Sequence, residues 1–197
     1  NAMVRASCIL QLALGNVGVS GGGTNIFRGH DNVQGATDIG PNPDSLPGYY
    51  GIAAGSWKHF AAVWGVDYDW IKGRFASQAM MEKPGMTVSR WIDGVLEKNE
   101  LIDQDSNLRA VVYWGHAPNS QSRGKEMVEA MKKLDLIVVV DPYPSATAAM
   151  AAMVRKDGVY LLPAATQFET SGSCTASNRS LQWRERVISP LFESQTD

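Results

Sequence analysis

Three apolar runs separated by two helical patterns constrain the fold of this chain more than any other feature. Residues 136–140 read Leu-Ile-Val-Val-Val, and β-rich runs occupy 108–114 and 158–162. Helical patterns fill the gaps at 123–134 and 146–154. This alternation is typical of an α/β domain whose parallel strands are joined by right-handed crossovers. We therefore predict a Rossmann-like, doubly wound parallel sheet flanked by helices, with its central strand buried on both sides.

Three loops follow the expected strands, at residues 115–120, 141–145 and 163–166. Ligands of open parallel sheets bind beyond the carboxyl ends of the strands. The first loop is a glycine turn before a helix, where amide N–H groups can face an anion. Asp141 in the second loop has two readings: it accepts bonds from a ribose or a guanine edge, or it caps the next helix. This end of the sheet is a candidate nucleotide site.

The first half of the chain has helical rather than strand patterns. We predict a short, mostly buried helix at residues 4–14, ended by Gly15, and two further helices at 56–64 and 88–96. The aromatic side chains of this half have few basic neighbours, so we expect them to pack inside the protein and not to stack on nucleic acid. Residues 51–107 should form a helical layer before the sheet.

The most polar stretch is residues 28–38, which read Arg-Gly-His-Asp-Asn-Val-Gln-Gly-Ala-Thr-Asp. Glycines, prolines and asparagines flank it, so we predict a loop at 28–38, with neither helix nor strand. Together with the helix at 4–14 and the glycine-rich run after it, this loop makes residues 4–50 a candidate active-site loop region. Polar loops on a rigid scaffold are where binding and catalytic groups tend to lie. The alternative is an ordinary solvated surface loop.

Residues 28–38, preceded by Gly15-Asn16-Val17-Gly18, resemble the signature of the large subunit of molybdenum- or tungsten-dependent formate dehydrogenases. These enzymes are molybdopterin-guanine-dinucleotide oxidoreductases. The resemblance implies that Arg28 orients formate, because its guanidinium matches two carboxylate oxygens. It places His30 near the same site, although a loop histidine bonded to a neighbouring carbonyl is the other reading. The remaining polar residues, implied to fix the loop or contact the pterin, are Asn32, Gln34 and Asp38.

Two further blocks carry the resemblance. The loops at 115–120 and 141–145 resemble the guanine-nucleotide-binding domain of the family. Residues 162–183 resemble the stretch in which an acidic residue and a glycine precede an arginine and a glutamine; Ala176 stands where the family has an asparagine, with Asn178 close by. The cofactor-binding residues implied by the two blocks are Gly115, Pro118, Asn119, Asp141, Ser145, Glu169, Gly172, Arg179 and Gln182.

The resemblance also implies cofactors and partners. They are formate as substrate, molybdopterin guanine dinucleotide with Mo or W, a 4Fe-4S cluster in an upstream domain and electron-transfer subunits. The cysteine or selenocysteine metal ligand and the four-cysteine cluster motif of the family lie upstream of this region. We therefore expect an internal fragment of a catalytic subunit, inactive alone, with exposed apolar surface where the remaining domains of that subunit pack. Cys8, expected to be buried, and Cys174 show no metal-site spacing.

Composition narrows the remaining possibilities. A chain of 197 residues with 44% hydrophobic residues can bury one core. A formal charge of −2 does not indicate a nucleic-acid partner, and no apolar run is long enough to span a bilayer.

The chain divides into segments with different expected roles. We interpret residues 1–3 as the remnant of an expression tag, 108–165 as the nucleotide-binding core and 166–197 as a cofactor-contacting tail.

Three alternatives to formate dehydrogenase stay open from the sequence. One is another molybdopterin oxidoreductase, of the nitrate or polysulfide reductase type, for which a different loop at 28–38 would be expected. The second is a nicotinamide-binding Rossmann domain, which would need a Gly-x-Gly-x-x-Gly motif that the first strand of this chain does not have. The third is a non-catalytic module that binds guanine nucleotide.

Overall fold

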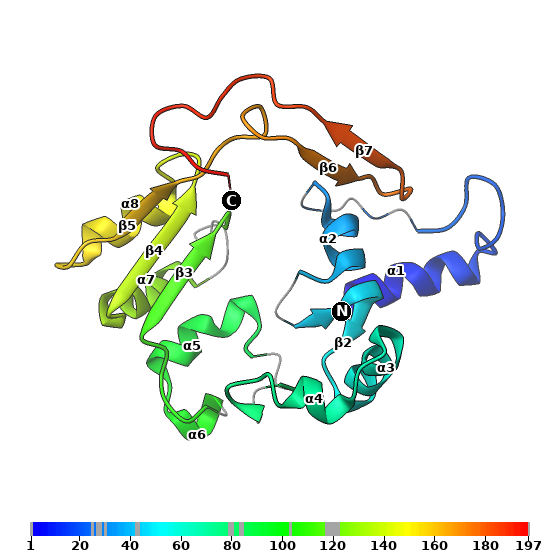
Figure 1. Cartoon of the computed structure of the whole chain (residues 1–197), viewed down its shortest axis with the longest axis horizontal. Helices are drawn as coiled ribbons and strands as arrows, with labels where there is room; N and C mark the ends of the chain where they lie inside the picture. The colour runs from blue at the N-terminus through cyan, green and yellow to red at the C-terminus, as the bar shows by residue number, and fades with distance from the viewer. Residues whose placement is uncertain are drawn as a thin grey trace.

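The structure is a computed structural model that describes residues 2–24, 26, 29, 31–41, 44–78, 81–82, 85–102, 104–116 and 123–196. Figure 1 shows the elements arranged around the molecule in chain order, with the α/β part on the left and helices along the bottom. A hairpin from the last third of the chain returns across the top to lie beside the N-terminal elements. Segments that are far apart in sequence therefore meet on the right of the view.

The sheet of the α/β part has three parallel strands in the order β3-β4-β5. The strands are β3 (Ala110–Trp114), β4 (Leu136–Asp141) and β5 (Tyr160–Pro163). The crossovers contain α7 (Gly124–Lys133) and α8 (Ala146–Val154). The predicted strand–helix alternation is confirmed, and its boundaries differ from the predicted ones by two residues at most.

The main core lies between one face of this sheet and three helices. Ile137 and Val139 of β4 are 1% and 0% exposed, and Met131 of α7 is 0% exposed. Trp91 from α5 (Trp91–Leu96) packs edge-to-face on Tyr113, with ring centroids 6.0 Å apart. Burial of one apolar stripe on each crossover helix is what the helical patterns at 123–134 and 146–154 indicate.

The other face of the sheet is open, which contradicts the expected burial on both sides. Val112, Trp114 and Leu162 are 55%, 61% and 50% exposed, and they line a groove of about 420 Å³. The cause is the strand order. Because β3, β4 and β5 follow one another in a single direction, right-handed crossovers place α7 and α8 on the same face. A doubly wound sheet needs a reversal of strand order, which the described strands do not contain.

The helical layer consists of short helices with small apolar clusters between them. Its members are α3 (Ala54–Trp64), α4 (Tyr68–Lys72), α5, α6 (Asn99–Ile102) and a 3₁₀ turn at Val88–Arg90. Gly65 ends α3 in the left-handed conformation at φ 67°, directly after residue 64, where the predicted helix ends. Trp57 packs edge-to-face on Phe75, and its indole N–H donates to the Met81 carbonyl at 3.1 Å. The predicted internal packing is confirmed for these two rings, but Trp64 and Trp70 are 49% and 53% exposed, so the prediction was wrong for them.

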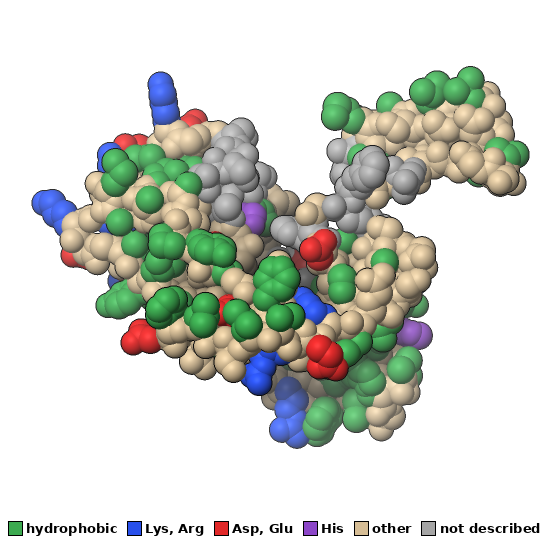
Figure 2. Space-filling model, turned by 90° about the horizontal axis from the view of Figure 1, so that it is seen from above, with side chains coloured by type: hydrophobic (Ala, Val, Ile, Leu, Met, Phe, Trp, Pro, Cys, Tyr) green, Lys and Arg blue, Asp and Glu red, His purple; other side chains and the backbone are tan. Residues whose placement is uncertain are grey.

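The N-terminal helix α1 (Ala2–Ala13) forms, but the prediction that it is buried was wrong. None of its residues is buried; Ile9, for example, is 64% exposed, and Cys8 is exposed as well. Figures 1 and 2 show that this helix and the glycine-rich residues after it project from the body of the molecule. An apolar composition predicts a helix, but it does not specify what the helix packs against.

Two small antiparallel sheets complete the described structure. β1 (Ser45–Leu46) pairs with β2 (Tyr50–Gly51) across a 3₁₀ turn at Pro47–Tyr49, and β6 (Gly172–Thr175) pairs with β7 (Leu181–Arg184). The C-terminal segment then joins the edge of the main sheet, where Gln195 N–H donates to the Pro163 carbonyl at 3.1 Å.

Hydrophobic side chains gather on the face seen in Figure 2. The most exposed apolar residues of β7 and the segment after it are Leu181, Trp183, Val187 and Phe192. Together with the open face of the sheet, they provide the exposed apolar surface that the sequence predicts. Among the described residues, no helix has the length and apolar character needed to cross a bilayer.

Candidate functional site

The polar signature segment contains a helix, α2 (Val33–Ile39), so the prediction of a continuous loop was wrong. Asn32 precedes the helix at φ 61°, and Gly40 ends it at φ 79°, both in the left-handed region. Within the helix the Thr37 hydroxyl donates to the Val33 carbonyl at 2.5 Å. The loop prediction relied on composition, which treats glycine as a helix breaker. The glycine inside this helix instead allows close packing.

That glycine is Gly35, which is buried. A Cβ at this position would stand 2.2 Å from Asn32 Oδ1 and 2.8 Å from Thr175 Oγ1. Thr175 lies at the end of β6, so α2 approaches the hairpin with no room for a methyl group. The amide of Thr175 also donates to Asn32 Oδ1 at 2.9 Å.

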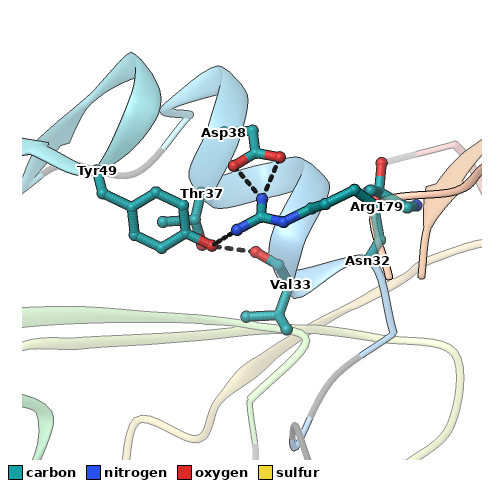
Figure 3. A network of polar contacts seen from close by, with 7 residues as sticks. Asn32, Val33, Thr37, Asp38, Tyr49 and Arg179 are labelled. Atoms are coloured by element: carbon teal, nitrogen blue, oxygen red, sulfur yellow. Dashed lines mark hydrogen bonds and ion pairs between the residues drawn. The ribbon is translucent and has the colours of Figure 1, made fainter. Parts of the chain in front are cut away.

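A second contact joins the other end of α2 to the same hairpin (Figure 3). The Arg179 guanidinium donates to both carboxylate oxygens of Asp38 through Nη1, and through Nη2 to the Tyr49 hydroxyl at 3.2 Å. The hydrogen bond to Asp38 raises the pKa of Arg179 above its ordinary value, followed by that to Tyr49. The first and third blocks of the sequence, 141 positions apart at this ion pair, are thus in direct contact.

The hairpin turn presents Arg179 in an unusual backbone conformation. Arg179 has φ 69°, a region that a residue with a Cβ seldom adopts. Ala176 N–H donates to the Ser180 carbonyl at 2.9 Å, and Asn178 Oδ1 accepts from Ser180 N–H at 3.0 Å, so the turn is closed on both sides of it. The sequence interpretation of residues 166–197 missed this hairpin, although Leu181 and Trp183 alternate with polar residues as in a strand.

The predicted nucleotide loops lie at the carboxyl end of the sheet. Gly115 ends β3 at φ 58°, and its N–H donates to the Val140 carbonyl at 3.0 Å. Asp141 Oδ1 accepts from Tyr143 N–H at 3.2 Å, and Ser145 Oγ accepts from Ala148 N–H at 3.4 Å. The helix cap is therefore Ser145, while Asp141 orders the turn at the tip of the strand.

A pocket of about 620 Å³ opens beside these loops. Its lining includes Tyr143 from the loop after β4, Pro163 from β5, Glu169 and Phe192. Glu169 is 5% exposed, and both of its carboxylate oxygens accept hydrogen bonds: Oε2 accepts from the amide and hydroxyl of Thr166 at 2.7 and 2.9 Å, and Oε1 from Leu191 N–H at 2.8 Å. These bonds, those from the two backbone amides first, lower the pKa of Glu169. Glu169 therefore connects two parts of the pocket wall, Thr166 and Leu191.

Residues 1–197 of this chain match a protein-family model described as "Molybdopterin oxidoreductase". The chain belongs to the molybdopterin oxidoreductase family. This agrees with the resemblance carried by the three sequence blocks, two of which the structure brings into contact.

Relatives within the molybdopterin oxidoreductases include two formate dehydrogenase subunits. The F420-dependent formate dehydrogenase subunit alpha of Methanocaldococcus jannaschii is 31% identical over 98% of this chain and 25% of its own length. The formate dehydrogenase subunit alpha of Megalodesulfovibrio gigas is 32% identical over 92% of this chain and 21% of its own length. A probable oxidoreductase of Bacillus subtilis, YjgC, is 35% identical over 95% of this chain and 16% of its own length. The chain thus spans a quarter or less of these relatives.

The remaining predicted site residues of this molybdopterin oxidoreductase chain divide into two groups. Gln34 is buried in α2, and Gly172 and Gln182 lie in the hairpin, paired with Arg184 and Cys174. The others, outside the described residues, are Arg28, His30, Pro118 and Asn119. In the described part of the chain, no three His, Cys, Asp or Glu side chains are grouped so that they could hold a metal ion.

The carboxyl end of the sheet has features that are compatible with a molybdopterin cofactor, the ligand that the family implies. The pocket beside the loops after β4 and β5 has a volume within the range of ~300–1,000 Å³ that is typical of ligand sites, although neither Gly115 nor Asp141 lines it. Among the described residues, no atom lies within 4 Å of the place of a Cβ at Gly115, so they leave room for a ligand near the backbone there. Asp141 uses one oxygen for its turn, and a carboxylate has a second oxygen with which to accept hydrogen bonds. A family ligand of this kind is therefore compatible with the described geometry.

Proposed function

We propose that this chain is part of the catalytic subunit of a formate dehydrogenase. The intact subunit oxidises formate to carbon dioxide, with release of one proton and two electrons. The observation that carries the proposal is the 28–38 signature, whose helical part is fastened to the hairpin by Asp38 and Arg179. The relatives named formate dehydrogenase support it, since two of them match more than nine-tenths of this chain.

The residues of the signature have separate roles in this proposal. Arg28 binds the two carboxylate oxygens of formate through its guanidinium fork, which fixes the direction of the C–H bond. His30 lies within the same substrate site. Asn32 and Asp38 hold the segment through their bonds to Thr175 and Arg179. Gln34 belongs to the buried face of α2.

The cofactor proposed for the intact subunit is bis-molybdopterin guanine dinucleotide with Mo or W. When bound, it supplies the electron acceptor that no side chain provides, and the electrons leave through iron–sulfur clusters. This chain contributes the residues that hold one guanosine arm: the backbone at Gly115, the strand-tip carboxylate of Asp141, and the loops that carry Pro118, Asn119 and Ser145. Glu169 and the hairpin residues Gly172 and Gln182 belong to the same set of cofactor-binding residues. The partners are the other domains of the subunit and an electron-transfer subunit.

The test is to replace Arg28 by Lys and by Ala in the full-length subunit that contains this chain. We expect kcat/KM for formate, followed by reduction of a dye, to fall by about 100-fold or more in both variants. Loss of a charged, hydrogen-bonded partner costs about 2–5 kcal/mol, and a lysine cannot reproduce the fork. Metal and pterin content, measured in each variant, should stay at the wild-type level.

A matched control is Arg109→Ala, which removes an exposed arginine paired with Asp135 at 2.5 Å, near the start of β3. It should leave formate oxidation unchanged. Rates near wild type in both Arg28 variants would contradict the role of Arg28. Activity of the wild-type subunit on another oxyanion but not on formate would contradict the substrate. Binding of guanine nucleotide by a subunit without any redox activity would favour the non-catalytic module.

A further inference from the structure

The contact between α2 and the hairpin concentrates backbone strain. We call it the seam and define it as residues Asn32, Asp38, Tyr49, Thr175 and Arg179. Three of these five have φ between 61° and 69°, namely Asn32, Tyr49 and Arg179. Among the described residues, only two other non-glycine residues have positive φ, Arg123 and Phe192. Left-handed backbone at non-glycine residues is costly and persists where the surrounding structure fixes it, often at functional sites.

The strained residues of the seam are also those that make its polar contacts. Arg179 reaches Asp38 and Tyr49 from a left-handed turn residue, and its guanidinium lies 5.5 Å from the centroid of the Tyr49 ring. Asn32, which lies directly before α2 in the left-handed conformation, accepts a hydrogen bond from the Thr175 amide. Both ends of the short helix are thereby tied to one hairpin. The seam therefore restrains the position of α2 relative to the hairpin.

We propose that Arg179 is a positioning residue for the signature segment, acting through Asp38 and Tyr49 to set the place of Arg28. The inference rests on the proposed function, since Arg28 must be the residue that holds formate. Only three residues separate Arg28 from Asn32, so a shift of α2 displaces the substrate arginine. This role is separate from the cofactor contact predicted for Arg179: Nη1 and Nη2 bind protein oxygens, while a guanidinium has five N–H donors in all.

The variants follow from the geometry. Arg179→Gly removes the guanidinium while it suits the left-handed turn, so the hairpin keeps its backbone. Arg179→Lys keeps the charge but loses the fork. Arg184→Ala is the control inside the same hairpin: Arg184 binds Thr170, with Nη2 2.8 Å from Thr170 Oγ1, and among the described residues it forms no hydrogen bond or ion pair with α2.

The first measurement is hydrogen exchange of the 197-residue chain. In Arg179→Gly and Asp38→Asn, the amides of α2 should exchange at least about tenfold faster, while those of α7 keep their wild-type rates. Arg184→Ala should leave α2 unchanged, and Arg179→Lys should fall between Arg179→Gly and wild type. Unchanged exchange of α2 in both Arg179→Gly and Asp38→Asn overturns the seam as a restraint.

The second measurement is kinetic and uses the full-length subunit. Arg179→Gly should lower kcat/KM for formate by about 10- to 100-fold, because a displaced substrate group loses alignment. In an Arg28→Ala background the same change should have no further effect, since a residue that acts through Arg28 cannot act in its absence. Additive losses overturn the positioning role and indicate a separate contact. If the wild-type subunit does not oxidise formate, the proposed function fails, while the exchange measurement still tests the seam.

Discussion

The α/β part and the seam are held together by different forces. In the α/β part, side chains such as Met131, Ile137 and Val139 are at most 1% exposed, and apolar burial fixes the position of each element. In the seam, Asp38 and Arg179 keep 39% and 48% of their side-chain surface exposed, and geometry depends on polar contacts. Partly exposed ion pairs contribute little to stability but restrict direction. One region therefore supplies stability, and the other supplies placement.

Replacing a core residue should have the largest effect and would test the first half of that comparison. Met131→Ala removes a fully buried side chain of α7, so we expect the free energy of unfolding to fall by about 2–5 kcal/mol. Urea denaturation followed by circular dichroism measures the loss. Met153→Ala, at a residue that is 86% exposed on α8, is the matched control and should change little. Equal losses in the two variants would contradict the assigned core.

Arg155 is the polar exception within the α/β part. Its guanidinium donates to the carbonyls of Gly158 and Met131, both at 2.8 Å, and also to that of Leu134. These contacts join the C-terminal end of α7 to the segment before β5. We expect Arg155→Ala to lower the free energy of unfolding by about 1.5–3 kcal/mol, since the carbonyls lose a charged donor. Lys156→Ala, beside it in sequence, is the control, and a similar loss there would remove the special role of Arg155.

The smallest effect concerns pH and the pocket wall. The pKa of Glu169 lies below its usual value of 4.5 in the folded chain, so its stabilising bonds are present above that pH. They are lost as the pH falls through the lower folded value. Glu169→Gln should therefore be less stable than wild type near neutral pH, and the difference should shrink in acid. Glu100→Gln, at an exposed carboxylate, is the control; a pH-independent difference for Glu169→Gln would contradict this role.

The same comparison explains what the sequence could predict. Periodicity located the strands and crossover helices of the α/β part because their contacts repeat along each element. It did not reveal the open face of β4, since the face covered by α7 and α8 depends on strand order. The composition of residues 28–38 wrongly predicted a loop where α2 forms. The glycine of that helix, Gly35, makes room for Thr175, which lies 140 positions later and cannot be foreseen from local sequence. The blocks at 28–38 and 162–183 were recognised separately, and only the fold shows that they meet.

The separation of Asp38 and Arg179 along the chain also determines an order of events. Closing a loop across 141 positions costs more entropy than pairing β3 with β4 across one crossover. The sheet and its helices lie between the two residues, and once folded they shorten the distance that the chain must span. We therefore expect the α/β part to fold first and the seam to close last. In local opening, we expect the seam to separate before the sheet does.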